Sequence, residues 1–280
     1  MTESVPTWIA LDQPALRQRL QQLGIAPDVL QDHWYADVPA SANLAAILEW
    51  HDDGIQLRAT DRELGNPIRV DFLHGKTGFR SQRFQHEMIV KAVMGRSRDP
   101  LSVLDCTAGL GRDGFLLAAA GFSVTLVERH PAIACLLLDG LKRAAEDWDA
   151  APVCARIRTH LGSAHDYLAQ LEAAAWPDVI CVDPMFSERG KTALVKKEMR
   201  LFRAVVGDDE DAEALLALAL QRARKRVVVK RPRKAEFIGG RKPGYQLEGT
   251  SSRFDVYVVQ RLPVLASVSL LLFFLFYRLL

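Results

Sequence analysis

The chain has 280 residues, of which 49% are hydrophobic and 25% are charged, and its formal net charge at pH 7 is +2. These values are those of an ordinary globular protein, and they exclude the disordered, collagen-like and disulfide-rich classes. The four cysteines are widely spaced single residues, which favours buried reduced thiols over a disulfide framework or a zinc site, and we predict no metal ligands.

Residues 1–85 are expected to form a small N-terminal α+β subdomain. Residues 1–8 lack a basic segment followed by an apolar stretch, so they do not form a secretory signal, and we expect a cytoplasmic protein. The pattern that follows predicts a helix over residues 14–24 and strand-like segments over residues 55–59 and 68–72. Residues 75–84 then interleave glycines with cationic and aromatic side chains.

Residues 86–260 are expected to form the main domain, because short apolar strands alternate with amphipathic helices from residue 101 onward. This alternation indicates an α/β fold, in which a parallel sheet is covered by helices. Core strands are predicted at residues 101–105, 123–128, 156–161, 178–183 and 226–230, with a late edge strand at residues 254–259. Helices are predicted at residues 114–120, 131–148, 164–174 and 211–223.

A glycine-rich loop follows the first of these strands. Gly109, Gly111 and Gly114 match the dinucleotide fingerprint G-x-G-x-x-G, in which glycines let the backbone approach a bound nucleotide. This match alone has low specificity and leaves a nicotinamide oxidoreductase open. Arg112 and Asp113 begin the next helix where a pyrophosphate would sit, and an acid at that position opposes phosphate binding. We therefore expect a cofactor without phosphates, such as S-adenosylmethionine.

Further candidate cofactor contacts stand where neighbouring strands end. Asp105 precedes the glycines, and its carboxylate can hold the loop or accept hydrogen bonds from a cationic amino-acid group. Glu128 ends the next strand, where a carboxylate can accept hydrogen bonds from both hydroxyls of a ribose. Ser163 follows the third strand at the same edge of the sheet, and its hydroxyl is also a natural helix N-cap.

The fourth strand brings an Asp183-Pro184-Met185-Phe186 turn to this edge. The exocyclic amine of a nucleobase is a poor nucleophile, because its lone pair is conjugated into the ring. The Asp183 carboxylate and the Pro184 carbonyl could accept the two amine hydrogens and favour a pyramidal nitrogen. Phe186 would stack on the base. The turn therefore predicts methyl transfer to a nucleobase amine, achieved mainly by positioning and electrostatics.

Cationic residues gather on both sides of this turn. Between residues 222 and 242, ten Lys or Arg side chains stand against one acid. Phosphate contacts supply much of the affinity for nucleic acids, so these side chains predict an RNA-binding surface. Its candidate residues are Arg80, Arg83, Lys196, Lys197, Arg200, Lys230 and Arg231.

The C-terminal residues 261–280 are expected to form an apolar tail. Residues 262–280 approach the lower limit of about 17–25 residues for a membrane span. Pro263, Ser267 and Ser269 interrupt the run, and it follows the pattern of a soluble enzyme. We expect a tail that packs on the protein or has no function of its own, with a membrane anchor as the less favoured alternative.

Five blocks of sequence, in fixed order, carry a family resemblance. They are Asp105-Cys-Thr-Ala-Gly-Leu-Gly-Arg-Asp113, Glu128-Arg129, Asp183-Pro-Met-Phe186, Ala193-Leu-Val-Lys-Lys-Glu-Met-Arg200 and Arg226-Val-Val-Val-Lys-Arg-Pro232. Together they resemble the ribosomal RNA small-subunit methyltransferase J family, over residues 65–257. The resemblance implies a Rossmann-like class I methyltransferase fold, with a mostly parallel seven-stranded sheet covered by helices on both faces. It also implies methyl transfer from S-adenosylmethionine to the N2 amine of a guanine in 16S ribosomal RNA, either free or in the small ribosomal subunit.

The resemblance also assigns cofactor contacts by position. They fall on Arg112, Asp113, Glu128, Arg129, Ser163, Ala164 and Asp183. Asp183 would then lie near both the methionine end of the cofactor and the target amine. Ala164 stands where the family pattern often has a second serine, and the apolar tail has no counterpart in the resemblance.

Other functions fit parts of the same pattern. An adenine-N6 methyltransferase acting on RNA or DNA would use the same Asp183 turn, since either amine suits it. A nicotinamide oxidoreductase would rest on the glycines alone and would leave Asp183 without a role. A non-catalytic RNA-binding or assembly module would keep the fold without the chemistry.

Overall fold

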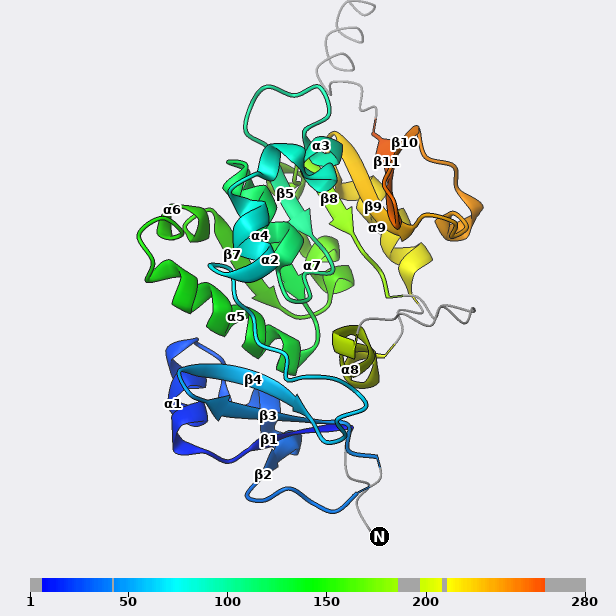
Figure 1. The fold of residues 1–280 in the computed structure, drawn as a ribbon. Helices are drawn as coiled ribbons and strands as arrows, with labels where there is room; N and C mark the ends of the chain where they lie inside the picture. The colour runs from blue at the N-terminus through cyan, green and yellow to red at the C-terminus, as the bar shows by residue number, and fades with distance from the viewer. Residues whose placement is uncertain (1–6, 42, 186–196, 208–210, 260–280) are drawn as a thin grey trace, which may run out of the picture.

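The computed structural model describes residues 7–41, 43–185, 197–207 and 211–259, and they build two sheets with their helices (Figure 1). Within these residues the larger sheet has seven strands in the order β10-β11-β9-β8-β5-β6-β7. The strands are β5 (Ser102–Asp105), β6 (Ser123–Glu128), β7 (Ile157–Leu161), β8 (Val179–Val182), β9 (Arg226–Pro232), β10 (Tyr245–Glu248) and β11 (Ser252–Val258). β5 pairs in parallel with β6 and β8, and the outer pairs β6–β7 and β8–β9 are parallel too. β11 runs antiparallel to β9 and β10.

Helices cover both faces of this sheet. They are α2 (Gly75–Ser81), α3 (Met88–Met94), α4 (Arg112–Ala119), α5 (Pro131–Ala145), α6 (Ala151–Cys154), α7 (Ala164–Gln170), α8 (Lys197–Val206) and α9 (Ala212–Arg222). Strand side chains alternate between the faces, so Val103 and Val228 pack in the core shared with α3, α4 and α5. Leu104 and Val227 point the other way, into the core shared with α7 and α9.

The smaller sheet precedes this domain. It is formed by β1 (Trp8–Leu11), β2 (Trp34–Tyr35), β3 (Ala46–His51) and β4 (Gly54–Ala59), in the order β2-β1-β3-β4, with α1 (Pro14–Gln22) beside it. Short 3₁₀ helices occur at Pro27–His33, Phe84–His86, Ala173–Ala175 and Ile238–Gly240. The predicted boundary at residue 85 stays a prediction, and α2 lies before it yet packs against α4 of the larger domain.

The α/β fold predicted from the sequence is confirmed, and each predicted core strand and main-domain helix forms within a few residues of its expected position. Two strand predictions are wrong. The segment at residues 254–259 is not at the edge, because β10, which the sequence analysis missed, pairs with its outer side. Residues 68–72 form no strand, since only Ile68 bonds to β4, through an isolated bridge to Leu57.

In the part of the chain that the structure describes, no helix combines the length and apolarity needed to cross a bilayer. The predicted tail at residues 261–280 lies outside the described residues.

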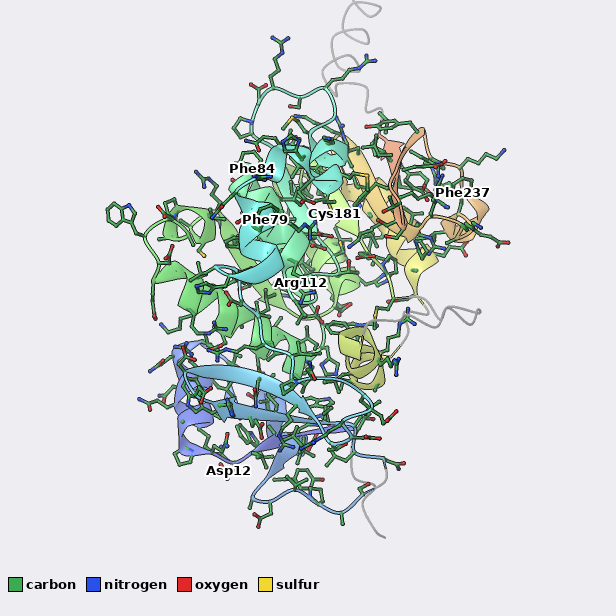
Figure 2. The ribbon with its side chains drawn as sticks, in the orientation of Figure 1. Asp12, Phe79, Phe84, Arg112, Cys181 and Phe237 are labelled. Carbon is green, nitrogen blue, oxygen red and sulfur yellow. The ribbon has the colours of Figure 1, made fainter. Side chains whose placement is uncertain are left out.

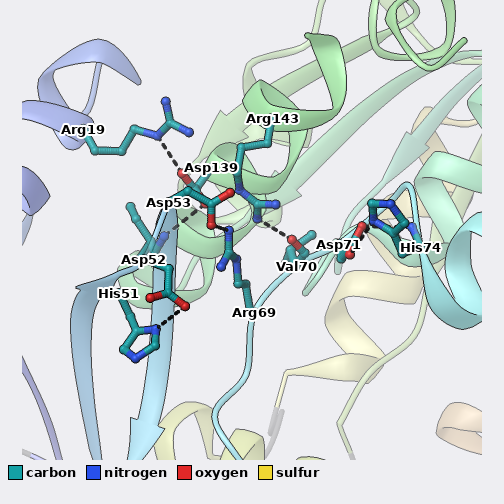
Figure 3. A network of polar contacts seen from close by, with 11 residues as sticks. Arg19, His51, Asp52, Asp53, Arg69, Val70, Asp71, His74, Asp139 and Arg143 are labelled. Carbon is teal, nitrogen blue, oxygen red and sulfur yellow. Dashed lines mark hydrogen bonds and ion pairs between the residues drawn. The ribbon is translucent and has the colours of Figure 1, made fainter. Parts of the chain in front are cut away.

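A buried carboxylate joins the small sheet and α1 to helix α5 of the larger domain (Figure 3). Asp139 on α5 is fully buried, and its Oδ1 accepts from Arg19 Nε of α1 at 2.6 Å. Its Oδ2 accepts from Arg143 Nε at 2.9 Å and from the Ile55 backbone N–H of β4 at 3.1 Å. Arg143 also donates to the Val70 carbonyl. Asp139 therefore fixes the small sheet on α5.

We predict that Asp139→Ala lowers the free energy of unfolding by about 3–5 kcal/mol, because it leaves the arginine charges without their buried partner. Urea unfolding followed by circular dichroism measures this change. Asp53→Ala is the matched control, since Asp53 pairs with Arg69 in the same region but is 80% exposed. The control should unfold close to the wild type, and equal losses in the two variants would contradict the importance of the buried site.

Candidate active site

A cavity of about 440 Å³ opens where β5, β6, β8 and β9 reach their carboxyl ends. In doubly wound sheets this edge, near the point where the strand order reverses, is where ligands bind. The side chains and backbone of the glycine loop form one wall, and α8 and α9 contribute another. The lining includes Asp105, Gly109, Arg112, Asp113, Glu128, Arg129, Ser163, Ala164, Asp183, Pro184, Met185, Phe202, Arg203, Asp211 and Lys230. The volume lies in the range of about 300–1,000 Å³ that is usual for small-molecule sites.

Strand register brings the polar groups of the cavity together. Asp105 on β5 pairs laterally with Cys181 on β8, and Val182 pairs with Val229 on β9. The next residues along β8 and β9, Asp183 and Lys230, therefore lie side by side. Side chains two apart on a strand share a face, so all three polar side chains point to the side of the sheet that α4 covers.

The glycines of the loop divide into two kinds. Gly109 (φ 54°) and Gly111 (φ 72°) both have left-handed backbone, which favours glycine. A Cβ on Gly111 would lie 2.3 Å from Leu137 Cδ1, and a Cβ on Gly114 would lie 2.3 Å from Leu126 Cδ2. These two glycines allow α4 to pack against β6 and α5. A Cβ on Gly109 would meet no atom nearer than 3.7 Å, so this residue forms the open floor of the cavity.

Asp105 holds the start of the loop. Its Oδ1 accepts from the Thr107 backbone N–H at 3.1 Å and lies 3.5 Å from the Thr107 hydroxyl. That hydroxyl in turn accepts from the Asp183 backbone N–H at 2.7 Å. Burial raises the pKa of Asp105 to about 7, and the nearby charges of Asp113 and Asp183 act in the same direction. Thr107 therefore links the loop to the Asp183 turn.

Glu128 supports the loop from the neighbouring strand. Its Oε2 accepts from the Gly109 backbone N–H at 2.7 Å, and its Oε1 accepts from the His130 backbone N–H at 2.8 Å. Both bonds fix the carboxylate against the cavity wall. Glu128 is 8% exposed and lines the cavity.

Charged groups at the mouth of the cavity come from three elements. Asp211, just before α9, lies 3.1 Å from His165 Nε2 and 3.8 Å from Arg129 Nη1.

Ser163 caps α7, because its hydroxyl accepts from the Asp166 backbone N–H. Ala164 is buried beside it. The sequence prediction that Ser163 is an N-cap is confirmed.

Lys230 lies between two carboxylates inside the cavity. Its Nζ is 2.8 Å from Asp113 Oδ2 and 2.8 Å from Asp183 Oδ2. Arg80, on α2, approaches Asp113 Oδ1 at 3.8 Å and makes a bidentate pair with Glu87. Lys230 and Arg80, predicted to bind RNA, thus point toward acidic partners of the protein.

The remaining predicted RNA residues are dispersed. Arg83 is exposed and lies over the ring of Phe79, itself 59% exposed, which Figure 2 labels on the α2 segment. Arg200 is exposed on α8. Arg231 is buried and donates to the Glu236 carbonyl, so the structure does not bring it to a surface where phosphates could reach it. Lys197 begins α8, while Lys196 and the predicted stacking residue Phe186 lie outside the described residues.

Sequence reasoning missed part of the site. Thr107 stands inside the predicted loop, but its bond to the Asp183 turn depends on strand register. Phe202, Arg203 and Val206 reach the cavity from α8, which the sequence analysis did not identify as a helix. The strong amphipathic pattern of residues 197–206 was the signal that could have identified it.

Comparisons with known proteins bear on this geometry. The family model "Putative SAM-dependent methyltransferase" matches residues 30–259. Two bacterial relatives are each named ribosomal RNA small subunit methyltransferase J. The chain is 51% identical over 221 residues to that of Thioalkalivibrio sulfidiphilus, covering 78% of this chain and 86% of the relative. It is 48% identical over 253 residues to that of Pseudomonas paraeruginosa, covering 88% and 96%.

A solved structure is similar over nearly the whole chain. It is a SAM-dependent methyltransferase from Neisseria gonorrhoeae with 32% sequence identity and a TM-score of 0.67, and the match covers 93% of this chain and 99% of that one. These matches exclude the hypothesis that the glycine loop belongs to a nicotinamide oxidoreductase. They confirm S-adenosylmethionine as the predicted cofactor. The chain belongs to the ribosomal RNA small subunit methyltransferase J family of S-adenosylmethionine-dependent methyltransferases.

Proposed function

We propose that this enzyme methylates the N2 amine of a guanine in the RNA of the small ribosomal subunit. The observation that carries the proposal is the position of the Asp183-Pro184 turn. The Asp183 backbone N–H donates to the Thr107 hydroxyl at 2.7 Å, and this bond holds the turn against the glycine loop. The names of the relatives support the RNA substrate. We infer that the enzyme acts in the bacterial cytoplasm. Its substrate would be ribosomal RNA that is either free or in an assembled subunit.

The residues around the cavity fit S-adenosylmethionine. This cofactor carries a sulfonium and an ammonium charge, and the lining offers the carboxylates of Asp105, Asp113 and Glu128. Glu128 would accept hydrogen bonds from the ribose hydroxyls, while Asp105 and Asp113 would face the amino-acid end. Asp113 in the first turn of α4 disfavours a pyrophosphate at that position.

Methyl transfer needs an oriented amine. Bound S-adenosylmethionine supplies an electrophilic methyl group. After taking the methyl group the amine nitrogen would have to give up one proton, and the Asp183 carboxylate, as its hydrogen-bond acceptor, could take it. The Asp183 carboxylate and the Pro184 carbonyl would accept the amine hydrogens, and so align the nitrogen lone pair with the methyl group.

An adenine-N6 methyltransferase is the remaining chemical alternative, because the same turn could accept hydrogens from that amine. The relatives' names favour ribosomal RNA but do not specify the base. Guanine is therefore the part of the proposal that rests on the family resemblance.

We predict that Asp183→Ala lowers kcat on small-subunit RNA by about 10²–10³-fold, because the amine loses a preorganised acceptor. Mass spectrometry of digested RNA for N2-methylguanosine measures this loss. Asp178→Ala is the matched control, because Asp178 precedes the same strand at its opposite end and bonds to Ser102. Wild-type rates in the Asp183 variant would refute its catalytic role.

The affinity for S-adenosylmethionine should depend on pH through Asp105. Its pKa is raised to about 7, so the group is mostly protonated at pH 6 in the cofactor-free protein. Binding of a cationic ligand favours the ionised form, so affinity should rise by about eightfold between pH 6 and pH 7.5 and then level off. Calorimetry at a series of pH values measures this affinity. Asp105→Asn should bind weakly and without this pH dependence, whereas a flat profile in the wild type would exclude Asp105 as a cofactor contact.

The α2 surface is the part of the RNA-binding prediction that the geometry supports best. Phe79 is 59% exposed, Arg83 lies 4.8 Å from its ring centroid, and neighbouring Arg80 reaches the cavity. An exposed aromatic ring beside cations is suited to stacking a base and holding its phosphates. We propose that nucleotides flanking the target guanine bind there.

We predict that Phe79→Ala weakens RNA binding by roughly 5- to 150-fold, since stacking contributes about 1–3 kcal/mol per base, without changing its salt dependence. Arg83→Ala should instead reduce the slope of log affinity against log salt by about one. Salt titrations of RNA binding measure both. Trp148→Ala is the control, because Trp148 is 90% exposed but stands among Glu146, Asp147 and Asp149. An equal loss in this control would contradict a specific α2 surface.

A further inference from the structure

One lysine of the cavity lies directly between two carboxylates. The carboxylates of Asp113 and Asp183 come from α4 and from the end of β8, and both lie 2.8 Å from Lys230 Nζ. Asp105, on the strand beside β8, shares this face of the sheet and is 6% exposed. Like charges this close repel one another, so each carboxylate would take up a proton or turn away without a cation between them.

Lys230 is placed for this position by the sheet. β9 runs parallel to β8 with Val229 opposite Val182, so Lys230 emerges beside Asp183. Val228, two residues earlier, is buried in the core under α4, and Lys230 therefore points toward the first turn of that helix. The placement follows from the fold, and any side chain at this position would face both carboxylates.

The Lys230–Asp113 pair is the more sheltered of the two ion pairs, because its side chains are 32% and 23% exposed while the Asp183 side chain is 47% exposed. Beside them lies a hollow of about 20 Å³ walled by Ile89, Leu117 and Val228, which has room for about one water molecule. Burial lowers the pKa of Lys230, yet the charges of Asp183 and Asp113 outweigh it and raise that pKa above its ordinary value. Lys230 is therefore a permanent cation inside the cavity.

We propose that Lys230 is a positioning residue for methyl transfer, which holds the Asp183 carboxylate ionised and oriented toward the target amine. This inference rests on the proposed function, because it assigns to Asp183 the part of amine acceptor. An ionised carboxylate can only accept hydrogen bonds, and this suits an amine, which donates them. A protonated Asp183 would instead offer a hydroxyl donor to the amine, and the two donors would not pair. The same ammonium ties Asp183 to Asp113, and so couples the amine end of the cavity to the cofactor end.

This role differs from contact with RNA phosphates, the role that the sequence predicts. A phosphate that approached Lys230 would have to enter between Asp113 and Asp183, against their charge. The other charged groups of the cavity near this cluster are Asp105 on β5, Arg80 on α2, Arg112 on α4 and Arg203 on α8, while Arg231 points to the opposite face of β9. Among these, Arg80 already pairs with Glu87, at 2.6 Å.

Lys230→Met tests the proposal, because it removes the charge and keeps the length of the side chain. We expect kcat on small-subunit RNA to fall about 100-fold, with KM for RNA within about threefold of the wild type. The rising acid limb of the pH–rate profile should move to higher pH by one unit or more, since Asp183 loses its cation. Lys230→Arg should restore the wild-type pH profile even if kcat stays reduced, because it restores the charge.

Cofactor binding separates positioning from a merely structural role. At a pH above the shifted acid limb, where the carboxylates stay ionised, removing a cation makes the cavity more negative, so S-adenosylmethionine, with its extra positive charge, should bind as tightly as before or more tightly. The ratio of the affinity for S-adenosylmethionine to the affinity for S-adenosylhomocysteine should rise at least about threefold. A disrupted cavity would instead weaken both ligands. Calorimetry on the folded variants, with folding checked by circular dichroism, measures these affinities.

Lys225→Met is the matched control. Lys225 pairs with Asp178 at 3.2 Å, at the opposite ends of the same two strands, and lies outside the cavity. We expect its kcat, pH profile and affinities to match the wild type. An unchanged kcat and pH profile in Lys230→Met, or a loss of S-adenosylmethionine binding as large as the loss of kcat, would overturn the proposal. A wild-type enzyme that methylates no small-subunit RNA would refute the proposed function, while the two cofactor affinities would still decide whether Lys230 sets the charge of the cavity.

Discussion

The parallel pairing of β5, β8 and β9 is the constraint on which the site depends. Because the strands are in register and their side chains alternate, the residues at their carboxyl ends share one face of the sheet. Asp105, Asp183 and Lys230 meet there although they are far apart in the sequence. A slip of one residue in β9 would turn Lys230 to the other face, toward α7 and α9, and leave the carboxylates without it.

The glycine loop builds the cofactor side from that edge. Gly111 and Gly114 serve packing, since side chains there would collide with Leu137 and Leu126. Gly109 leaves space for the ligand. The same three glycines serve dinucleotide enzymes, so they do not distinguish cofactors; the acid at the start of α4 does. The cavity lining sets the carboxylates of Asp105, Asp113, Glu128 and Asp183 among cationic side chains, and Lys230 lies directly between two of these carboxylates.

Much of this architecture could be predicted from the sequence. Strand positions followed from short apolar runs, and the functional edge followed from polar residues at their ends, as with Asp105, Glu128 and Asp183. Contacts that depend on register or on tertiary packing could not be predicted. The basic composition around Lys230 suggested phosphate binding, whereas its partners are carboxylates brought from other elements. The role of Asp139 could not be predicted either. An acid within an amphipathic helix does not indicate that arginines of two elements will pair with it.

The Asp183 turn, in the function proposed above, directs methyl transfer to a guanine amine of small-subunit RNA. The most direct measurement is a map of methylated nucleosides in that RNA from cells that lack the gene, with and without complementation. We expect that one N2-methylguanosine disappears, returns with the wild-type gene, and does not return with Asp183→Ala. An unchanged set of N2-methylguanosines, or loss of an N6-methyladenosine instead, would contradict it.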